Sequence, residues 1–171
     1  MTKQHAATPA DAPMIRRATP ADGPAVRAIV FGTLRSYGIE PDPDGLDADV
    51  IAFGAHGDGP IDEFVAVVDG HVVGSVAVSP ADDRNGHLSK FFVDGAYRGR
   101  GIGRLLLARA VAEARRRGYG HVDLETRTAF QEAVHLYEAT GWRRGPDRPP
   151  GHGPDRTYRL DLDAERTPEF R

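Results

Sequence analysis

Apolar residues recur along the chain in two rhythms, one typical of strands and one typical of helices. Short alternating or continuous apolar runs predict strands, because successive side chains of a strand point to opposite faces. These runs cover residues 14–19, 63–68, 71–79, 87–93, 121–126 and 156–162. Apolar residues spaced three or four apart predict helices. Helices are expected over about 24–34, near 47–49, from a glycine-rich turn to about 117, and over 130–140.

Turn residues separate these elements and set their order. Asp69-Gly70 stands between two β-rich runs, and this dipeptide favours the tight turn of a hairpin. Gly118 and Gly141 follow expected helices, where glycine readily adopts the left-handed cap. Asp22 is the expected cap at the start of the first helix. The order, three strands followed by strand–helix–strand–helix–strand, indicates an α/β fold with some parallel pairing.

Three glycines stand where the helix after the strand 87–93 is expected to begin. The segment GAYRGRGIGRLLL carries Gly99, Gly101 and Gly103, although a glycine inside a helix costs roughly 0.5–1 kcal/mol relative to alanine. A helix start binds anions, because it presents unpaired N–H groups and the positive end of the helix dipole. Glycine lets that backbone approach a phosphate closely. The turn is therefore a candidate phosphate site, with positive charge added by Arg98, Arg100 and Arg104.

The spacing within this turn excludes two common phosphate motifs. The P-loop pattern GxxxxGK[ST] is absent, and the dinucleotide pattern GxGxxG fails because Leu106 occupies its last position. The pattern present is Arg-x-x-Gly-x-Gly, formed by Arg98, Gly101 and Gly103. An apolar helix, the strand HVDLET and the segment AVHLYEATGW follow it.

Together these features resemble the core of the GNAT superfamily of acyl-CoA-dependent N-acyltransferases, over about residues 88–142. The resemblance implies one α/β (α+β) domain over 14–163, between disordered tails at 1–13 and 164–171. It implies a mixed sheet of six to seven strands, about four flanking helices, and splayed parallel strands at the cofactor site. It also implies acetyl-CoA as cosubstrate, with its pyrophosphate on the turn and its pantetheine arm on the preceding strand. The cofactor-binding residues so implied are Phe92, Val93, Arg98, Gly99, Arg100, Gly101, Ile102, Gly103 and Arg104.

The resemblance further implies catalytic roles. Tyr137 matches the tyrosine whose hydroxyl acts as general acid toward the CoA sulfur; the alternative is a core tyrosine at helical spacing. Members often place a basic glutamate on the strand before the glycine turn, but HLSKFFV contains no acid. His87 occupies that place and can accept a proton near neutral pH, while a water chain, Glu125 and the loop EPDPDGLDAD are the alternatives. Phe130 stands where many members have an asparagine, so that side chain's cofactor contact must be lost or supplied elsewhere.

Two loops are implied to build the acceptor site, LRSYGIEPDPDG and GPDRPPGHGPD. Arg35, Ser36 and Tyr37 are the candidates for substrate contact, and Arg35 can hold a carboxylate in a bidentate fork or remain a solvated arginine at a helix end. The expected function is transfer of the acetyl group of acetyl-CoA to a primary amine of a small molecule or amino acid, by direct attack in a ternary complex. The alternatives are a longer acyl-CoA donor and a non-catalytic acyl-CoA-binding module.

Composition narrows the class of partners. A formal net charge of -3 over 171 residues lacks the basic excess of a general nucleic-acid binder. There is no cysteine, and the seven histidines lack zinc-site spacing, so no metal is expected. The start MTKQHAATPADAP does not look like a signal peptide, and no apolar run approaches the ~20 residues of a membrane span. We expect a cytoplasmic protein without a membrane partner, and a homodimer by analogy with the family.

Overall fold

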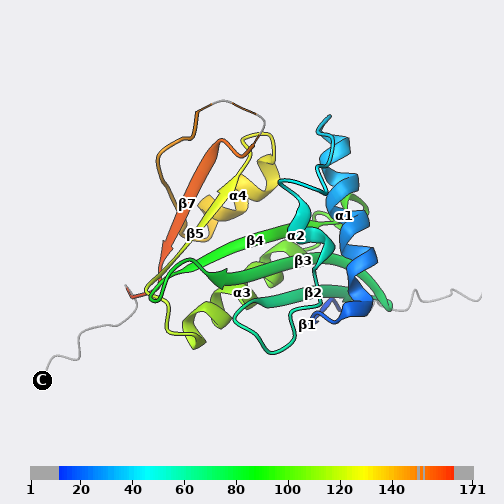
Figure 1. Ribbon diagram of the computed structural model, residues 1–171, viewed down its shortest axis with the longest axis horizontal. Helices are drawn as coiled ribbons and strands as arrows, with labels where there is room; N and C mark the ends of the chain where they lie inside the picture. Colours follow the sequence, from blue (N-terminus) through cyan, green and yellow to red (C-terminus); the bar gives the residue numbers. More distant parts are fainter. Residues whose placement is uncertain (1–11, 150, 152, 164–171) are drawn as a thin grey trace, which may run out of the picture.

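A mixed sheet of seven strands organises the chain, with helices on both of its faces (Figure 1). The computed structural model describes residues 12–149, 151 and 153–163. The strands are β1 Met14–Arg17, β2 Asp62–Val68, β3 His71–Pro80, β4 Gly86–Val93, β5 His121–Thr126, β6 Arg143–Arg144 and β7 Arg156–Asp161. The helices are α1 Gly23–Ser36, α2 Ala48–Ile51, α3 Ile102–Arg116 and α4 Gln131–Ala139, with short 3-10 turns η1 Pro20–Asp22 and η2 Gly95–Tyr97. The tails expected at 1–13 and 164–171 lie outside the described residues, apart from Ala12 and Pro13.

The strand order places a gap inside the sheet. The order is β1-β2-β3-β4-β5-β7-β6, and among the described strands β4 and β5 are the one parallel pair. These two strands pair through Gly86–Leu88 of β4 and Val122–Leu124 of β5. Within the described chain, the later part of β4 is not paired with β5, and this opening between the two strands is called the gap below. The fold class expected from the sequence is confirmed, including the splayed parallel strands.

The hairpin of β2 and β3 shows how local chemistry produces the sheet. Asp69 and Gly70 have φ values of 48° and 76°, and two successive positive φ values give the turn whose twist matches that of the strands. Alternation along β2 then sends Phe64 to one face of the sheet and Val65 to the other. The predicted hairpin is confirmed.

Two hydrophobic clusters hold the helices to the sheet, one on each face. Leu106 and Ala110 of α3 and Val134 of α4 are buried against one face. Val26 and Val30 of α1 are buried against the other face, together with a residue of α2. In Figure 1, α1 and α2 lie over the near face and α3 lies behind the strands. The gap between β4 and β5 is therefore approached from two differently built sides.

Two local expectations are corrected. Asp22 precedes α1, but its side chain does not cap that helix. Its carboxylate instead accepts a hydrogen bond from the Thr19 backbone N–H at 2.8 Å and pairs with Arg16 at 2.7 Å. β6 was not expected, because a strand of two residues is too short to show any pattern.

Two buried acids anchor α3 to the edge of the sheet. Asp62 accepts hydrogen bonds from Arg17 at 2.9 Å and from Arg117 at 2.9 Å. Glu113 accepts from the Nε of Arg116 and from Arg17, each at 2.9 Å. These guanidinium groups, Arg116 first, outweigh burial and lower the pKa of Glu113 from 4.5 to about 2. The cluster joins β1, β2 and α3 through charge-assisted hydrogen bonds.

Candidate active site

A bulge in β4 lies at the point where this strand leaves β5. Lys90 has a φ of 54°, and the register between β3 and β4 shifts between Ser75 and Ala77. The Ser75 hydroxyl donates to the Lys90 carbonyl at 2.7 Å and so holds the distorted backbone. A bulge bends its strand and increases the local twist. It accounts physically for the way in which the last residues of β4 turn away from β5.

The glycine turn presents an uncapped helix start beside this gap. Gly101 is the N-cap of α3 with a φ of 79°, and Gly99 has a φ of 74°. Both positions therefore require a left-handed backbone that glycine adopts without a steric cost. Since Gly101 has no side chain with which to cap α3, the amides of the first helical turn are available to an anion.

Gly103 serves a different purpose, although it belongs to the same motif. It lies in the first turn of α3, where a Cβ would come within 3.3 Å of the Phe91 Cζ and 3.4 Å of the Leu136 Cδ2. Its lack of a side chain therefore lets α3 start close to β4 and α4. The two backbone glycines and this packing glycine together explain why the motif needs three.

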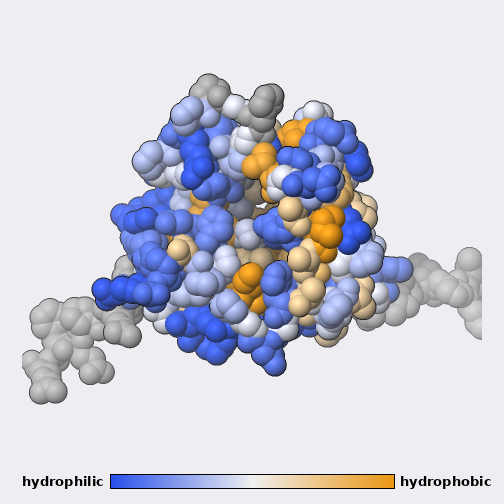
Figure 2. All heavy atoms as spheres, in the orientation of Figure 1, coloured by the Kyte–Doolittle hydropathy of each residue, from blue (hydrophilic) through white to orange (hydrophobic). Residues whose placement is uncertain are grey.

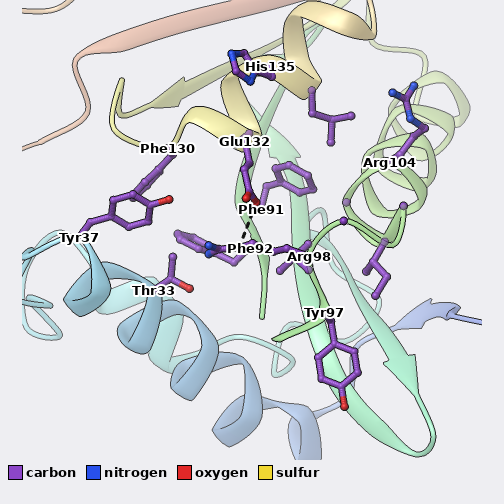
Figure 3. Close-up of a pocket in the computed structure, with 17 residues that line it drawn as sticks. Thr33, Tyr37, Phe91, Phe92, Tyr97, Arg98, Arg104, Phe130, Glu132 and His135 are labelled. Atoms are coloured by element: carbon purple, nitrogen blue, oxygen red, sulfur yellow. Dashed lines mark ion pairs between the residues drawn. The ribbon is translucent and has the colours of Figure 1, made fainter. Parts of the chain in front are cut away.

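A cavity of about 470 Å³ extends from the glycine turn through the gap in the sheet (Figure 3). Its lining includes residues that pack with α3 and α4, such as Phe91 and Leu136, and residues on the α1 side, such as Phe92 and Phe130. The cavity thus reaches both faces of the sheet. The lining residues are Thr33, Tyr37, Phe91, Phe92, Val93, Tyr97, Arg98, Gly99, Gly101, Ile102, Gly103, Arg104, Phe130, Glu132, Ala133, His135 and Leu136.

The arginines of the turn differ in their surroundings. Arg98 and Arg104 line the cavity, and the Nε of Arg98 lies 3.4 Å from the Oε2 of Glu132 in α4 (Figure 3). Arg100 does not line the cavity; its guanidinium lies over the Tyr97 ring, 5.0 Å from the centroid. The turn therefore offers the cavity two cations, one of which already has a carboxylate partner.

Three aromatic rings line the α1 side of the cavity (Figure 3). Phe130, just before α4, meets Tyr37 edge-on at a centroid distance of 5.0 Å and Phe92 at 6.1 Å. These three rings, called the aromatic wall below, connect α1 to β4 and to the loop before α4.

The space-filling view shows a hollow in the face that Figure 1 presents, with hydrophilic residues over β5 and β7 and apolar residues toward α1 and α2 (Figure 2).

Tyr137 lies next to the cavity but is not among its lining residues. It is only 3% exposed, and its ring packs between Phe91, Trp142 and Tyr158 at centroid distances of 5.8, 5.7 and 5.6 Å. Burial, aided by the neighbouring Tyr158, raises the pKa of the Tyr137 phenol above its ordinary value of 10.0. Through Phe91, which lines the cavity, the ring is one residue away from the gap.

His87 lies on the paired part of β4, away from the cavity lining. In the parallel register it stands beside Asp123, and Phe91 is four residues further along, roughly 13 Å at the usual strand rise. Burial is the main influence that lowers the pKa of His87 below its ordinary 6.5, with the Glu125 charge opposing it. Glu125 itself forms an ion pair with Arg148. A proton from the gap would therefore have to cross this distance to reach His87.

Of the three residues predicted to contact the acceptor, one lines the cavity and two do not. Tyr37 lines the cavity as part of the aromatic wall. Arg35 instead lies 3.7 Å from Glu40 in an exposed ion pair, and Ser36 donates to the Thr33 carbonyl at 2.6 Å. Neither Arg35 nor Ser36 is part of the main cavity.

Several cavity residues were not predicted, among them Thr33, Tyr97, Glu132 and His135. Thr33 belongs to α1, and only the packing of α1 against β4 brings it to the gap. Glu132 lies three residues before His135 and four before Leu136 on α4, so these residues share one face of the helix, and helical spacing could have indicated them. Within the described residues, no group of three or more His, Asp or Glu side chains could hold a metal ion, and no helix is long and apolar enough to cross a membrane.

Comparison with known proteins agrees with this geometry. The model of the Acetyltransferase (GNAT) family matches residues 28–142, which include the turn, the gap and α4. The chain belongs to this family. Streptothricin acetyltransferase of Streptomyces lavendulae is 38% identical over 104 residues, covering 60% of this chain and 54% of that protein. N-acetylaspartate synthetase of Danio rerio is 43% identical over 83 residues, covering 47% of this chain and 29% of that protein.

A solved structure shows the same fold across nearly the whole chain. A putative acetyltransferase from Salmonella typhimurium, determined with its cofactor acetyl-CoA, superposes with a TM-score of 0.74. The match covers 93% of this chain and 99% of that chain at 22% identity. The GNAT chain described here spans about half, or less, of the length of the two curated relatives.

Proposed function

We propose that this GNAT protein transfers the acetyl group of acetyl-CoA to a primary amine of a small molecule or amino acid. The observation that carries the proposal is the uncapped start of α3 at Gly101, which opens into the gap where β4 leaves β5. An anionic group held at the turn can continue into this gap as an extended chain. The family relatives named for streptothricin and for N-acetylaspartate support an amine of a small molecule or amino acid as acceptor.

The described residues fit the chemistry of an acyl-CoA. The first-turn amides of α3, with Arg98 and Arg104, would hold phosphate groups. The free backbone edge of β4 near Phe92 and Val93 would accept a pantetheine arm in place of the missing strand. A backbone N–H in the same stretch would polarise the thioester carbonyl. The bound cosubstrate supplies the activated acyl group, and the protein supplies position and proton transfer.

Acyl transfer by direct attack forms the amide C–N bond and breaks the thioester C–S bond within one ternary complex. The attacking amine loses one proton, and the departing thiolate gains one. Tyr137 is our candidate donor to the sulfur, because its hydroxyl stays protonated and its ring adjoins the gap through Phe91. Since its pKa is raised, we expect it to stabilise the thiolate chiefly as a hydrogen-bond donor.

His87 is our candidate acceptor of the amine proton, through intervening water. It is neutral at pH 7, since its pKa lies below 6.5, and a neutral imidazole can accept a proton. Tyr37 is the candidate contact for the acceptor, because it stands at the α1 side of the gap.

Two measurements on the full chain test the proposal. Calorimetry measures the binding of acetyl-CoA and CoA, and a thiol-reactive dye follows CoA release with a panel of amines, amino acids and peptides. Binding together with amine-dependent CoA release would support the proposal. Binding without release to any amine would instead favour the non-catalytic module, and absence of binding would remove the proposed function.

A further inference from the structure

The cavity is cationic at the glycine turn and aromatic toward α1 (Figure 3). Arg104 and the start of α3 form the cationic end, whereas the Arg98 side chain reaches across the cavity toward Phe92 and Glu132 (Figure 3). The aromatic wall of Tyr37, Phe92 and Phe130 lines the α1 side (Figure 3). A ligand whose phosphates rest on the turn must therefore carry its reactive end toward the wall.

Phe130 is the residue that closes this wall. Its ring contacts the ring of Tyr37 at a centroid distance of 5.0 Å and the ring of Phe92 at 6.1 Å. Phe130 therefore bridges α1 and β4 across the cavity. The Phe130 side chain is half-buried, and its ring meets the Tyr37 ring edge-to-face. Aromatic pairs prefer this geometry, so the contact favours a fixed position of the Phe130 ring.

We propose that Phe130 sets the length of the acyl chain that this site accepts, limiting it to acetyl and similarly short groups. This inference rests on the proposed acyl-CoA function. Phe130 lines the cavity, and its ring contacts that of Phe92, on the strand that would hold the pantetheine arm, so an acyl chain longer than acetyl would meet this ring. Packed aromatic rings do not yield space without losing their contacts. Removal of the ring would open room that the additional methylenes of a longer acyl group can fill.

The test compares acyl donors in the intact protein. For wild type, Phe130→Ala and Phe130→Leu, kcat/KM is measured with acetyl-CoA and butyryl-CoA against one amine, and the binding of both donors is measured by calorimetry. Two newly buried methylenes correspond to roughly 15-fold in affinity, so the butyryl-to-acetyl ratio should rise by about tenfold or more in Phe130→Ala. Phe130→Leu keeps an apolar side chain at the site and should give an intermediate ratio.

Tyr97→Ala provides the matched control, because it removes an aromatic ring from the cationic end of the same cavity. It should change both donors by the same factor and leave their ratio as in wild type. A ratio that stays within about twofold of wild type in Phe130→Ala, with the amine KM changed instead, would assign Phe130 to the acceptor and overturn the inference. Failure of the wild-type protein to bind any acyl-CoA would instead remove the proposed function itself.

Discussion

Replacement of Glu132 by glutamine is expected to tighten the binding of acetyl-CoA, although Glu132 lines the cavity in which we propose that the cofactor binds. The Oε2 of Glu132 in α4 lies 3.4 Å from the Nε of Arg98, whose side chain extends from the turn into the cavity (Figure 3). If Arg98 binds a cofactor phosphate, it must exchange the carboxylate for that phosphate. Glu132 is then an internal competitor, and its negative charge also repels the phosphates.

Exposure of the two side chains limits the size of the effect. Arg98 is 30% exposed and Glu132 is 69% exposed. Pairs of this kind contribute about 0.2–1 kcal/mol, because water and salt screen them. Repulsion from a phosphate charge about 7 Å away adds about 0.6 kcal/mol per charge in water, less at physiological salt. The sum of about 0.8–1.6 kcal/mol at low salt corresponds to a dissociation constant about 4- to 15-fold lower in Glu132→Gln.

Calorimetric titration of acetyl-CoA into wild type and Glu132→Gln measures this change directly. Asp161→Asn is the control, since Asp161 forms an exposed ion pair with Arg143 away from the cavity, and its loss should leave the affinity unchanged. In an Arg98→Ala background the gain from Glu132→Gln should shrink to the repulsive part, and high salt should reduce it further. Weaker binding in Glu132→Gln would refute the reasoning, because the pair would then be closing over the cofactor rather than competing with it.

Four further changes probe the site and its support. Gly103→Val places a side chain against Phe91 and Leu136 and should weaken acetyl-CoA binding by about tenfold or more in calorimetry; unchanged affinity would contradict the close-packing role. Tyr137→Phe should lower kcat by about 10² with cofactor affinity unchanged, whereas a kcat near wild type in steady-state kinetics would leave Tyr137 a core residue. If His87 is the base, kcat/KM of wild type should fall in acid, at a pH lower than for an ordinary histidine because burial lowers the His87 pKa, and His87→Ala should abolish this fall; a retained acidic limb would assign the proton to another group. Glu113, with a pKa lowered from 4.5 to about 2, should contribute up to about 3 kcal/mol to the free energy of unfolding above pH 4.5, lost progressively as the pH falls toward about 2, and denaturant titration of Glu113→Gln should show a loss near neutrality that narrows in acid.

Most of the fold was predictable because its signals are local. Period-two alternation marked the long strands, Asp69-Gly70 marked the hairpin, and Gly118 adopts the positive φ expected at the end of α3. Two features were exceptions. β6 is too short to show any pattern, and the Asp22 carboxylate pairs with Arg16 and accepts a hydrogen bond from the Thr19 N–H instead of capping α1.

In the candidate site, too, the local features were predictable and the long-range contacts were not. Neighbouring residues were enough to identify the turn, because its glycines and arginines act through backbone conformation and charge within a few positions of one another. The partner of Arg98, the aromatic wall and the distance of His87 from the gap were not accessible in this way. They depend on where the bulge at Lys90 makes β4 leave β5, and on how α1 and α4 pack across the opening. Such contacts join residues up to about a hundred positions apart, and only the closed tertiary structure brings them within a few ångströms.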